Sequence, residues 1–189
     1  KVRGERFLAA EHVQHLKAKD LVLLDRGYPA FWLFVLILST HAQFCARVTT
    51  THWREIRKFY NSGRKERIIT LRPSFPSLSQ CNLLNLPILP IQLRAIRVEL
   101  DNGETEILLT SLMDKDLYPH EVFKEIYHLR WNVEENYKTA KCRIEIENFS
   151  GKSVESVYQD FHAKVFAMNL TAAITHPAQD IIARKSGQK

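Results

Sequence analysis

The segment EIYHLRWNVEENYKTAKCR (125–143) contains four residues of types that bind phosphates or metal ions, namely Tyr127, Arg130, Glu134 and Lys141. The segment has a helical pattern, and at about 100° per residue the four lie within a wedge about 60° wide. A carboxylate with cations on either side suits a metal ion whose substrate carries phosphates. Pairs such as Arg130 with Glu134 also occur on ordinary surface helices, so this spacing alone leaves both interpretations open.

The same helical wheel places the other faces of this segment. An apolar stripe beside the wedge predicts contact with a core and comprises Ile126, Leu129, Val133, Ala140 and Ile144. Glu135 lies about 100° away from Glu134, on the solvated face. Glu135 therefore lies outside the wedge that holds Glu134.

A second carboxylate, Asp25, closes the apolar run LVLLD (21–25). Such a run predicts a strand buried on both faces. Active sites of open α/β sheets gather at the carboxyl ends of strands, where Asp25 would lie. Carboxylates from separate elements are what hard cations need for phosphoryl transfer. The alternative is a turn in DRGYP (25–29) that Asp25 simply opens.

The elements that must position these residues follow from the pattern of apolar residues. The N-terminal part predicts a helix over 4–20, a strand over 21–25, a turn at 26–29, a buried helix over 30–42 with a strand as alternative, and a strand over 43–49. Segments 64–73 and 91–112 alternate as strands, and the DNGE of the second is a hairpin signal. The stretch 73–90, rich in Pro, Ser and Asn, predicts irregular structure.

The C-terminal part predicts helices. YPHE (118–121) leads into a long helix that Gly151 ends, and Ser153 is expected to cap a second helix over 154–174. The polar tail 176–189 is expected to be loose. The whole pattern predicts an α/β core at both ends of the chain with a β-rich insertion over 50–115.

Composition sets the class of protein. The 189 residues are 45% hydrophobic and 25% charged, as in a globular domain, and the net charge of +6 favours a polyanionic partner. Cys45, Cys81 and Cys142 have no metal-ligand or disulfide spacing and indicate reduced thiols of a cytosolic protein. The apolar run AFWLFVLIL (30–38) is too short to span a bilayer.

The spacing Tyr127-x2-Arg130-x3-Glu134-x6-Lys141 matches the Y-x2-R-x3-E-x6-K signature of the insertion sequence 4 family of bacterial DDE transposases. LLDRGYP (23–29) resembles the block that carries the second catalytic aspartate of that family. ETEILLTSL (104–112) and the segment that follows it resemble the approach to the catalytic glutamate. The resemblance covers residues 4 to 174.

This resemblance implies an α/β fold with an RNase H-like catalytic core, incomplete at its N-terminus, and a β-rich insertion before the glutamate-bearing helix. Residues 1–49 would be the second part of the core, 50–115 the insertion, 116–175 the C-terminal helices of the core and 176–189 the tail. The resemblance also implies metal-dependent cutting and joining of DNA at transposon ends, with a homodimer in the synaptic complex. Such a protein would work in the bacterial cytoplasm, at the nucleoid, and would not bind membranes.

Carried over by position, Asp25 and Glu134 would be the catalytic ligands of Mg²⁺ or Mn²⁺. Tyr127, Arg130 and Lys141 would bind the phosphates or terminal nucleotides of the DNA ends. Arg130 can grip a phosphate with two hydrogen bonds, whereas Lys141 would act as a point charge.

Two weaker candidates for DNA contact lie elsewhere. Arg47 could point into the active-site cleft. Trp53 precedes a basic cluster within WREIRKFYNSGRKER (53–67), which could contact the DNA backbone while the indole stacks on an unpaired base. The alternative is a solvated basic face with Trp53 packed beneath it.

A DDE site needs one more aspartate upstream of Asp25. The only one is Asp20, at the start of the same expected strand and about 16 Å away, so it cannot substitute. We therefore expect this chain to be the C-terminal part of a transposase and to be inactive alone. The alternatives are another RNase H-like nuclease, such as a resolvase, or a non-catalytic DNA-binding product derived from a transposase.

Overall fold

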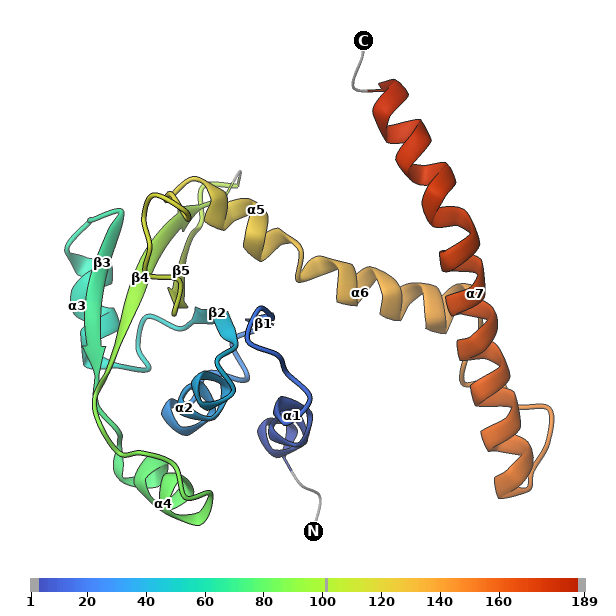
Figure 1. Cartoon of the computed structure of the whole chain (residues 1–189), viewed down its shortest axis with the longest axis horizontal. Helices are drawn as coiled ribbons and strands as arrows, with labels where there is room; N and C mark the ends of the chain where they lie inside the picture. Colours follow the sequence, from blue (N-terminus) through green and yellow to red (C-terminus); the bar gives the residue numbers. More distant parts are fainter. Residues whose placement is uncertain (1–3, 101, 187–189) are drawn as a thin grey trace. The chain divides into compact units, whose positions relative to one another are not determined.

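The computed structural model describes residues 4–100 and 102–186, with 176–186 as backbone only. The chain divides into two compact units, Lys1–Arg130 and Trp131–Lys189 (Figure 1). The first unit holds a sheet with helices, and the second is helical. Together they form a mixed α/β protein.

A five-stranded sheet forms the centre of the first unit (Figure 1). Its strands are β1 (Leu21–Leu24), β2 (Gln43–Val48), β3 (Glu66–Leu71), β4 (Ile91–Glu99) and β5 (Thr105–Thr110), in the spatial order β1-β2-β5-β4-β3. The pair β1–β2 is parallel, and the other three pairs are antiparallel. The expected strands are thus confirmed, and those of 50–115 join the same sheet as the strands before them.

One end of this sheet gathers several strand termini. β1 and β2 both finish there, because they are parallel. The antiparallel pairing of Val48 with Ile107 and of Glu99 with Thr105 places the start of β5 and the finish of β4 at that end too. The start of β3 lies there as well, because Glu66 pairs with Ile96. We call this the carboxyl end of the sheet.

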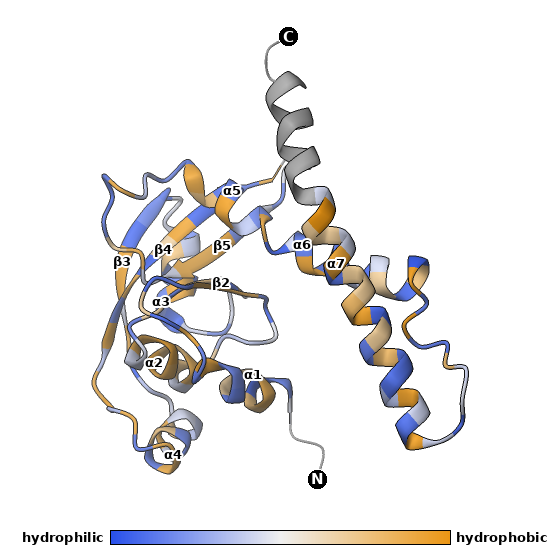
Figure 2. Cartoon of the chain, turned by 45° about the vertical axis from the view of Figure 1, so that its right-hand side comes forward, coloured by the Kyte–Doolittle hydropathy of each residue, from blue (hydrophilic) through white to orange (hydrophobic). Residues whose placement is uncertain are grey.

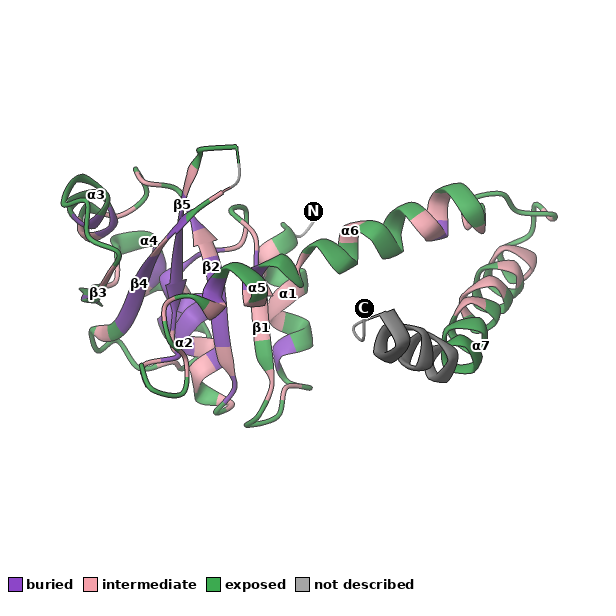
Figure 3. Ribbon diagram, turned by 90° about the horizontal axis from the view of Figure 1, so that it is seen from above, coloured by how far each residue is buried: buried purple, intermediate pink, exposed green. Residues whose placement is uncertain are grey.

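The buried apolar residues form two clusters of unequal size, one on each face of the sheet. Figures 2 and 3 colour the chain by hydropathy and by burial. The helices α1 (Glu5–Val13), α2 (Phe31–Ser39), α3 (Arg54–Asn61) and α4 (Phe75–Leu83) all contribute to the larger cluster on one face. There Phe34 stacks on Phe44 with ring centroids 4.3 Å apart. The opposite face holds a smaller cluster, to which α5 (Val122–His128) contributes Phe123 and Tyr127.

The DNGE turn between β4 and β5 confirms the hairpin prediction. Gly103 has φ of 83°, a left-handed conformation that glycine adopts without steric cost. Its N–H donates to the carbonyl of Leu100 at 2.9 Å, and the Leu100 N–H donates to the carbonyl of Glu104 at 2.8 Å.

Several predictions for the first unit were wrong. The helix over 4–20 ends at Val13, and a turn follows. The stretch 73–90 is not irregular throughout, since α4 forms there with Pro76 in its first turn and with Ser77 and Cys81 buried one helical turn apart. The helix α3 was missed because its charged residues hide the short apolar contact made by Ile56 and Phe59.

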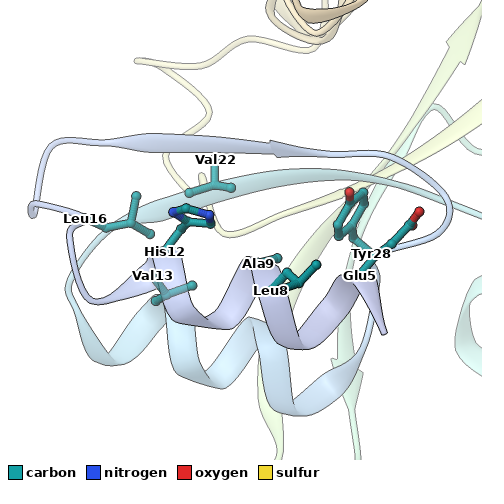
Figure 4. Close-up of a pocket in the computed structure, with 8 residues that line it drawn as sticks. All are labelled: Glu5, Leu8, Ala9, His12, Val13, Leu16, Val22 and Tyr28. Carbon is teal, nitrogen blue, oxygen red and sulfur yellow. The ribbon is translucent and has the colours of Figure 1, made fainter. Parts of the chain in front are cut away.

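The prediction that β1 is buried on both faces was also wrong. Leu21 is 36% exposed, and only Leu24 of this strand is buried. Within the described residues, β1 is an edge strand that pairs with β2 alone. Between β1 and α1 lies a hollow of about 400 Å³, lined mainly by apolar side chains such as Leu8, Leu16 and Val22 (Figure 4).

The second unit does not contain the single long helix expected after YPHE. The helix α5 of the first unit ends at His128, and α6 (Trp131–Lys138) passes into a π-helix, η1 (Thr139–Arg143). α7 (Val154–Ser186) begins as expected, with Ser153 Oγ accepting a hydrogen bond from the Ser156 N–H at 3.2 Å.

The tail expected to be loose is helical in its backbone as far as Ser186, and residues 187–189 lie outside the described part. No helix among the described residues is long and apolar enough to cross a bilayer. The three cysteines are free thiols, two of them buried and Cys142 exposed.

Candidate active site

Asp25 follows the last residue of β1 at the carboxyl end of the sheet, where it meets Arg47 of the neighbouring strand β2. The Arg47 guanidinium donates to Asp25 Oδ1 through Nε at 2.9 Å and lies at 2.7 Å through Nη2. The Arg26 backbone N–H donates to the same oxygen at 2.7 Å. The other oxygen, Oδ2, lies 3.9 Å from Nη1 of Arg130. One oxygen of Asp25 is thus held by hydrogen bonds, while the second faces a cation beyond hydrogen-bonding distance.

Glu106 is a further carboxylate of this cluster. Its side chain is only 7% exposed and accepts a hydrogen bond from Nη1 of Arg47 at 2.5 Å, with Arg26 Nη2 at 3.4 Å. Arg47 therefore bridges Asp25 and Glu106. Sequence reasoning missed Glu106, although a carboxylate at the start of the buried run EILLT (106–110) was a signal that a cation must come from another strand.

The helix α5 contributes Tyr127 to the same place. Its hydroxyl lies 3.4 Å from Asp25 Oδ1 and 3.4 Å from the carbonyl of Leu24. The guanidinium groups of Arg47 and Arg130 lie 6.0 and 5.6 Å from the centre of the tyrosine ring, within cation–π range. The aromatic ring thus lies beside both arginines and orients them around Asp25.

The electrostatics of the cluster follow from these contacts. Burial favours the neutral form of Asp25, but the hydrogen bonds from Arg26 and Arg47 and the charges of Arg47 and Arg130 outweigh it and lower the pKa of Asp25. Burial raises the pKa of the Tyr127 phenol well above its ordinary value. Asp25 is therefore an anion at neutral pH, and Tyr127 remains a hydrogen-bond donor.

Glu134 and Lys141 belong to the second unit, on α6 and on η1. Lys141 Nζ pairs with Glu147 at 2.9 Å and lies 4.9 Å from the centre of the Tyr137 ring. Hydrogen bonds to Tyr137 and Glu147 raise the pKa of Lys141. The structure thus assembles Asp25, Tyr127 and Arg130 in one unit and places the other two signature residues on another.

The helical wheel assumed one continuous helix, but the helix is broken at residues 129–130. The faces predicted by the wheel are therefore kept for some residues and not for others. Tyr127 is buried and the Arg130 side chain is 10% exposed, so both do border the core. Leu129 and Val133 of the expected core stripe are instead 56% and 69% exposed. Glu135 is on the surface as expected, with Lys138 Nζ at 2.7 Å.

Trp53 lies on the other face of the sheet, at the start of α3. Its ring is tilted against Phe34, with centroids 6.0 Å apart, and against His52, with centroids 4.1 Å apart. Trp53 is thus packed against neighbouring rings, as in the second of the two alternatives given above. A stacking role of Trp53 on a DNA base stays a prediction.

The donor set was tested for a hard divalent cation. Within residues 4–100 and 102–175, no three His, Cys, Asp or Glu side chains cluster in a way that could hold a metal ion. Asp25 is the type of ligand that a hard divalent cation binds, because it is an anionic oxygen ligand with a side chain that is 38% exposed. Two arginines beside one exposed carboxylate can bind a phosphate next to a cation.

Such a cluster combines a carboxylate and two arginines at the end of a sheet strand. The family model of the transposase DDE domain matches residues 3–170, and the chain belongs to this family. No curated protein and no solved structure matches the chain.

Proposed function

We propose that this chain acts in DNA transposition as the part of a transposase that carries Asp25 and Glu134 within an RNase H-like core. The observation that carries the proposal is the convergence of Arg47, Tyr127 and Arg130 on Asp25 at the carboxyl end of the sheet. Membership of the transposase DDE domain family supports it independently. The complete spacing from Tyr127 to Lys141 favours the insertion sequence 4 group.

In this proposal Asp25 and Glu134 hold Mg²⁺ or Mn²⁺ through carboxylate oxygens. The bound cation would supply Lewis-acid polarisation of the scissile phosphate and a more acidic attacking water or 3′-hydroxyl. Asp25 suits this role because its lowered pKa keeps it ionised at neutral pH. Its Oδ1 accepts hydrogen bonds from Arg26 and Arg47, whereas its Oδ2 lies 3.9 Å from Nη1 of Arg130.

The basic residues bind the DNA. Arg130 offers a planar guanidinium that matches two oxygens of a phosphate, and Lys141 adds a point charge. Arg47 is held between Asp25 and Glu106, so it presents a fixed positive charge beside the cation. The Tyr127 hydroxyl donates to Asp25 and can donate to a phosphate oxygen instead.

Cleavage of DNA depends on how many carboxylates can bind the metal ion. Asp20 is the only aspartate before Asp25, and the strand β1 separates the two, so Asp20 lies at the opposite end of the sheet. Glu106 is engaged by Arg47 and Arg26, so Asp25 and Glu134 are the two carboxylates proposed as ligands. With two such ligands rather than three, we expect the chain alone to bind the cation and DNA without cutting. Detectable metal-dependent nicking by this chain would contradict that expectation.

The test is Mn²⁺ binding by calorimetry, with and without a short duplex that ends in a free 3′-hydroxyl. We expect Asp25→Asn and Glu134→Gln each to weaken Mn²⁺ binding, and the control Glu135→Gln to leave it unchanged. An affinity of Asp25→Asn equal to that of the unmodified chain would refute the proposed site. DNA binding that persists without any Mn²⁺ binding would favour the alternative, a non-catalytic DNA-binding protein.

A further inference from the structure

One side chain, Arg47, lies between two carboxylates on neighbouring strands. Asp25 follows the β1 residue that pairs with Ala46, so it lies level with Arg47 of β2. On its other side Arg47 pairs with Leu108, two residues along β5 from Glu106. Nε and Nη2 of Arg47 contact Asp25, while Nη1 contacts Glu106. One guanidinium is thus the counter-ion of both acids.

The Asp25 oxygen that Arg47 contacts has no lone pair left for a metal ion. A carboxylate oxygen offers about two lone pairs to donors or cations. Oδ1 of Asp25 accepts from the Arg26 backbone N–H at 2.7 Å and from Nε of Arg47 at 2.9 Å, with Nη2 of Arg47 at 2.7 Å. A divalent cation binds a lone pair of its ligand directly, at about 2.1 Å for Mg²⁺. Coordination through Oδ1 therefore requires Arg47 to withdraw.

The second oxygen of Asp25 does not avoid this conflict. A cation bound to Oδ2 alone would lie close to the Arg47 guanidinium, because Arg47 is hydrogen-bonded to the other oxygen of the same carboxylate. Arg130 also approaches Oδ2, with Nη1 at 3.9 Å. Positive charges at such short distances repel one another. Binding of a cation at either oxygen is therefore opposed while Arg47 keeps its contacts with Asp25.

Glu106 gives Arg47 a partner to keep when it leaves Asp25. The Glu106 side chain is buried, whereas that of Asp25 is partly exposed. A buried carboxylate is costly to leave without a cation, so the contact of Arg47 with Glu106 should outlast its contacts with Asp25. Arg26 reaches Glu106 only at 3.4 Å, through a largely exposed side chain. Asp25 is therefore the partner of Arg47 that a metal ion can replace.

We propose that Arg47 is an internal counter-ion that a divalent cation displaces from Asp25, while Glu106 retains the guanidinium. This inference rests on the proposed function, since it concerns the cation that Asp25 binds. Arg47 is a positioning residue in this exchange, because it acts through Asp25 and sets the affinity of the site for the metal ion. One positive group replaces another, so the two carboxylates are compensated before and after the exchange.

The first test follows Arg47 in the unmodified chain by NMR during a titration with Mg²⁺. The loss of one signal in Arg47→Lys identifies the Nε–H of Arg47. As Mg²⁺ binds, we expect this signal to move toward that of a solvated guanidinium and its exchange with water to accelerate. An Nε–H that keeps its shift and its protection up to saturation with Mg²⁺ would overturn the inference.

The second test compares Mn²⁺ binding by calorimetry in Arg47→Gln and in the matched control Arg26→Gln. Each variant removes one positive charge from the cluster. Only Arg47→Gln removes side-chain contacts with Asp25, because Arg26 donates to Asp25 through its backbone N–H. Thermal unfolding of each variant verifies that the fold is kept.

We expect Arg47→Gln to bind Mn²⁺ at least about tenfold more tightly than the unmodified chain, the effect of removing a unit charge about 5 Å from a divalent cation even at the screening of bulk water. The gain in Arg26→Gln should be smaller. Equal affinities for Arg47→Gln and the unmodified chain would overturn the inference. An equal gain in Arg26→Gln would do so too, since it would assign the effect to net charge alone.

Failure of the proposed function gives a different result. Mn²⁺ binding that Asp25→Asn leaves unchanged would place the cation away from Asp25, and the proposed function and this inference would then both fall. If Asp25→Asn weakens Mn²⁺ binding while Arg47→Gln does not strengthen it, only the displacement of Arg47 is wrong.

Discussion

The two units of the chain differ in how their apolar side chains are used. In the first unit Phe34, Phe44 and Phe123 are fully buried on the two faces of the sheet. In the second unit, Ala140 is the only buried residue between 131 and 175, while Val133 and Phe166 are 69% and 67% exposed. The signature from Tyr127 to Lys141 crosses from one kind of packing to the other.

This difference assigns different physical roles to the two halves of the signature. Tyr127 and Arg130 are held by contacts with the sheet, so their geometry is set before any substrate binds. Glu134 and Lys141 lie on helices with an uncovered apolar face, and most helical stability comes from covering such a face. The glutamate half of the site should therefore be the more easily disturbed.

The largest expected effect contrasts a buried phenylalanine of the first unit with an exposed one of the second. Phe44→Ala should lower the free energy of unfolding by about 3–5 kcal/mol, because it opens a cavity against the stacked Phe34. Phe166→Ala, on an exposed position, should change it by at most about 0.5 kcal/mol. Urea unfolding followed by tryptophan fluorescence measures both. Similar losses in the two variants would mean that the second unit has a core after all.

The second contrast concerns ion pairs. Arg47→Met leaves the buried Glu106 with only the more distant Arg26 as its cation and should cost about 2–4 kcal/mol. Lys141→Met breaks a surface pair with Glu147 and a contact with the exposed Tyr137 ring, and should not shift the unfolding midpoint. Chemical denaturation compares the two. Adding Glu106→Met to Arg47→Met should recover part of the loss, and no recovery would assign the cost to lost packing of Arg47.

A smaller, local effect is expected at the start of α7. Ser153→Ala removes the hydrogen bond to the Ser156 N–H and should destabilise the first turn by about 1 kcal/mol. Amide hydrogen exchange would then accelerate about fivefold in that turn. The amides of α2 in the first unit serve as the internal reference. Faster exchange in both helices would show that the cap matters to the whole chain.

The smallest effect is the pH dependence that Asp25 contributes. Its pKa is lower in the folded than in the unfolded chain, so the unfolded chain binds the proton more tightly. This contribution to stability is present above the ordinary pKa of 3.8 and is lost as the pH falls through the lower folded value. Unfolding curves between pH 2 and 6 should show a shallower acid loss for Asp25→Asn. The same acid slope in both proteins would contradict this coupling.

Local patterns predicted much of the first unit correctly. The strands β1 to β5, the helix α2 and the turn at Gly103 follow from alternation, apolar runs and turn residues, all of which act over a few neighbouring residues. The helix α3 was missed for the opposite reason. Its apolar contact, made by Ile56 and Phe59, becomes apparent only when the sheet they cover is known.

The sequence by itself determined the chemical types of the candidate site and their order along the chain. Asp25 at the end of an apolar strand and the spacing from Tyr127 to Lys141 were both readable without a structure. Only the tertiary structure decided that Glu106 shares Arg47 with Asp25 across β2 and β5, and that the signature helix is interrupted before Trp131. The physical reason is range. A helical or strand pattern reports on near neighbours, whereas the partner of a buried charge comes from any strand that the sheet places beside it.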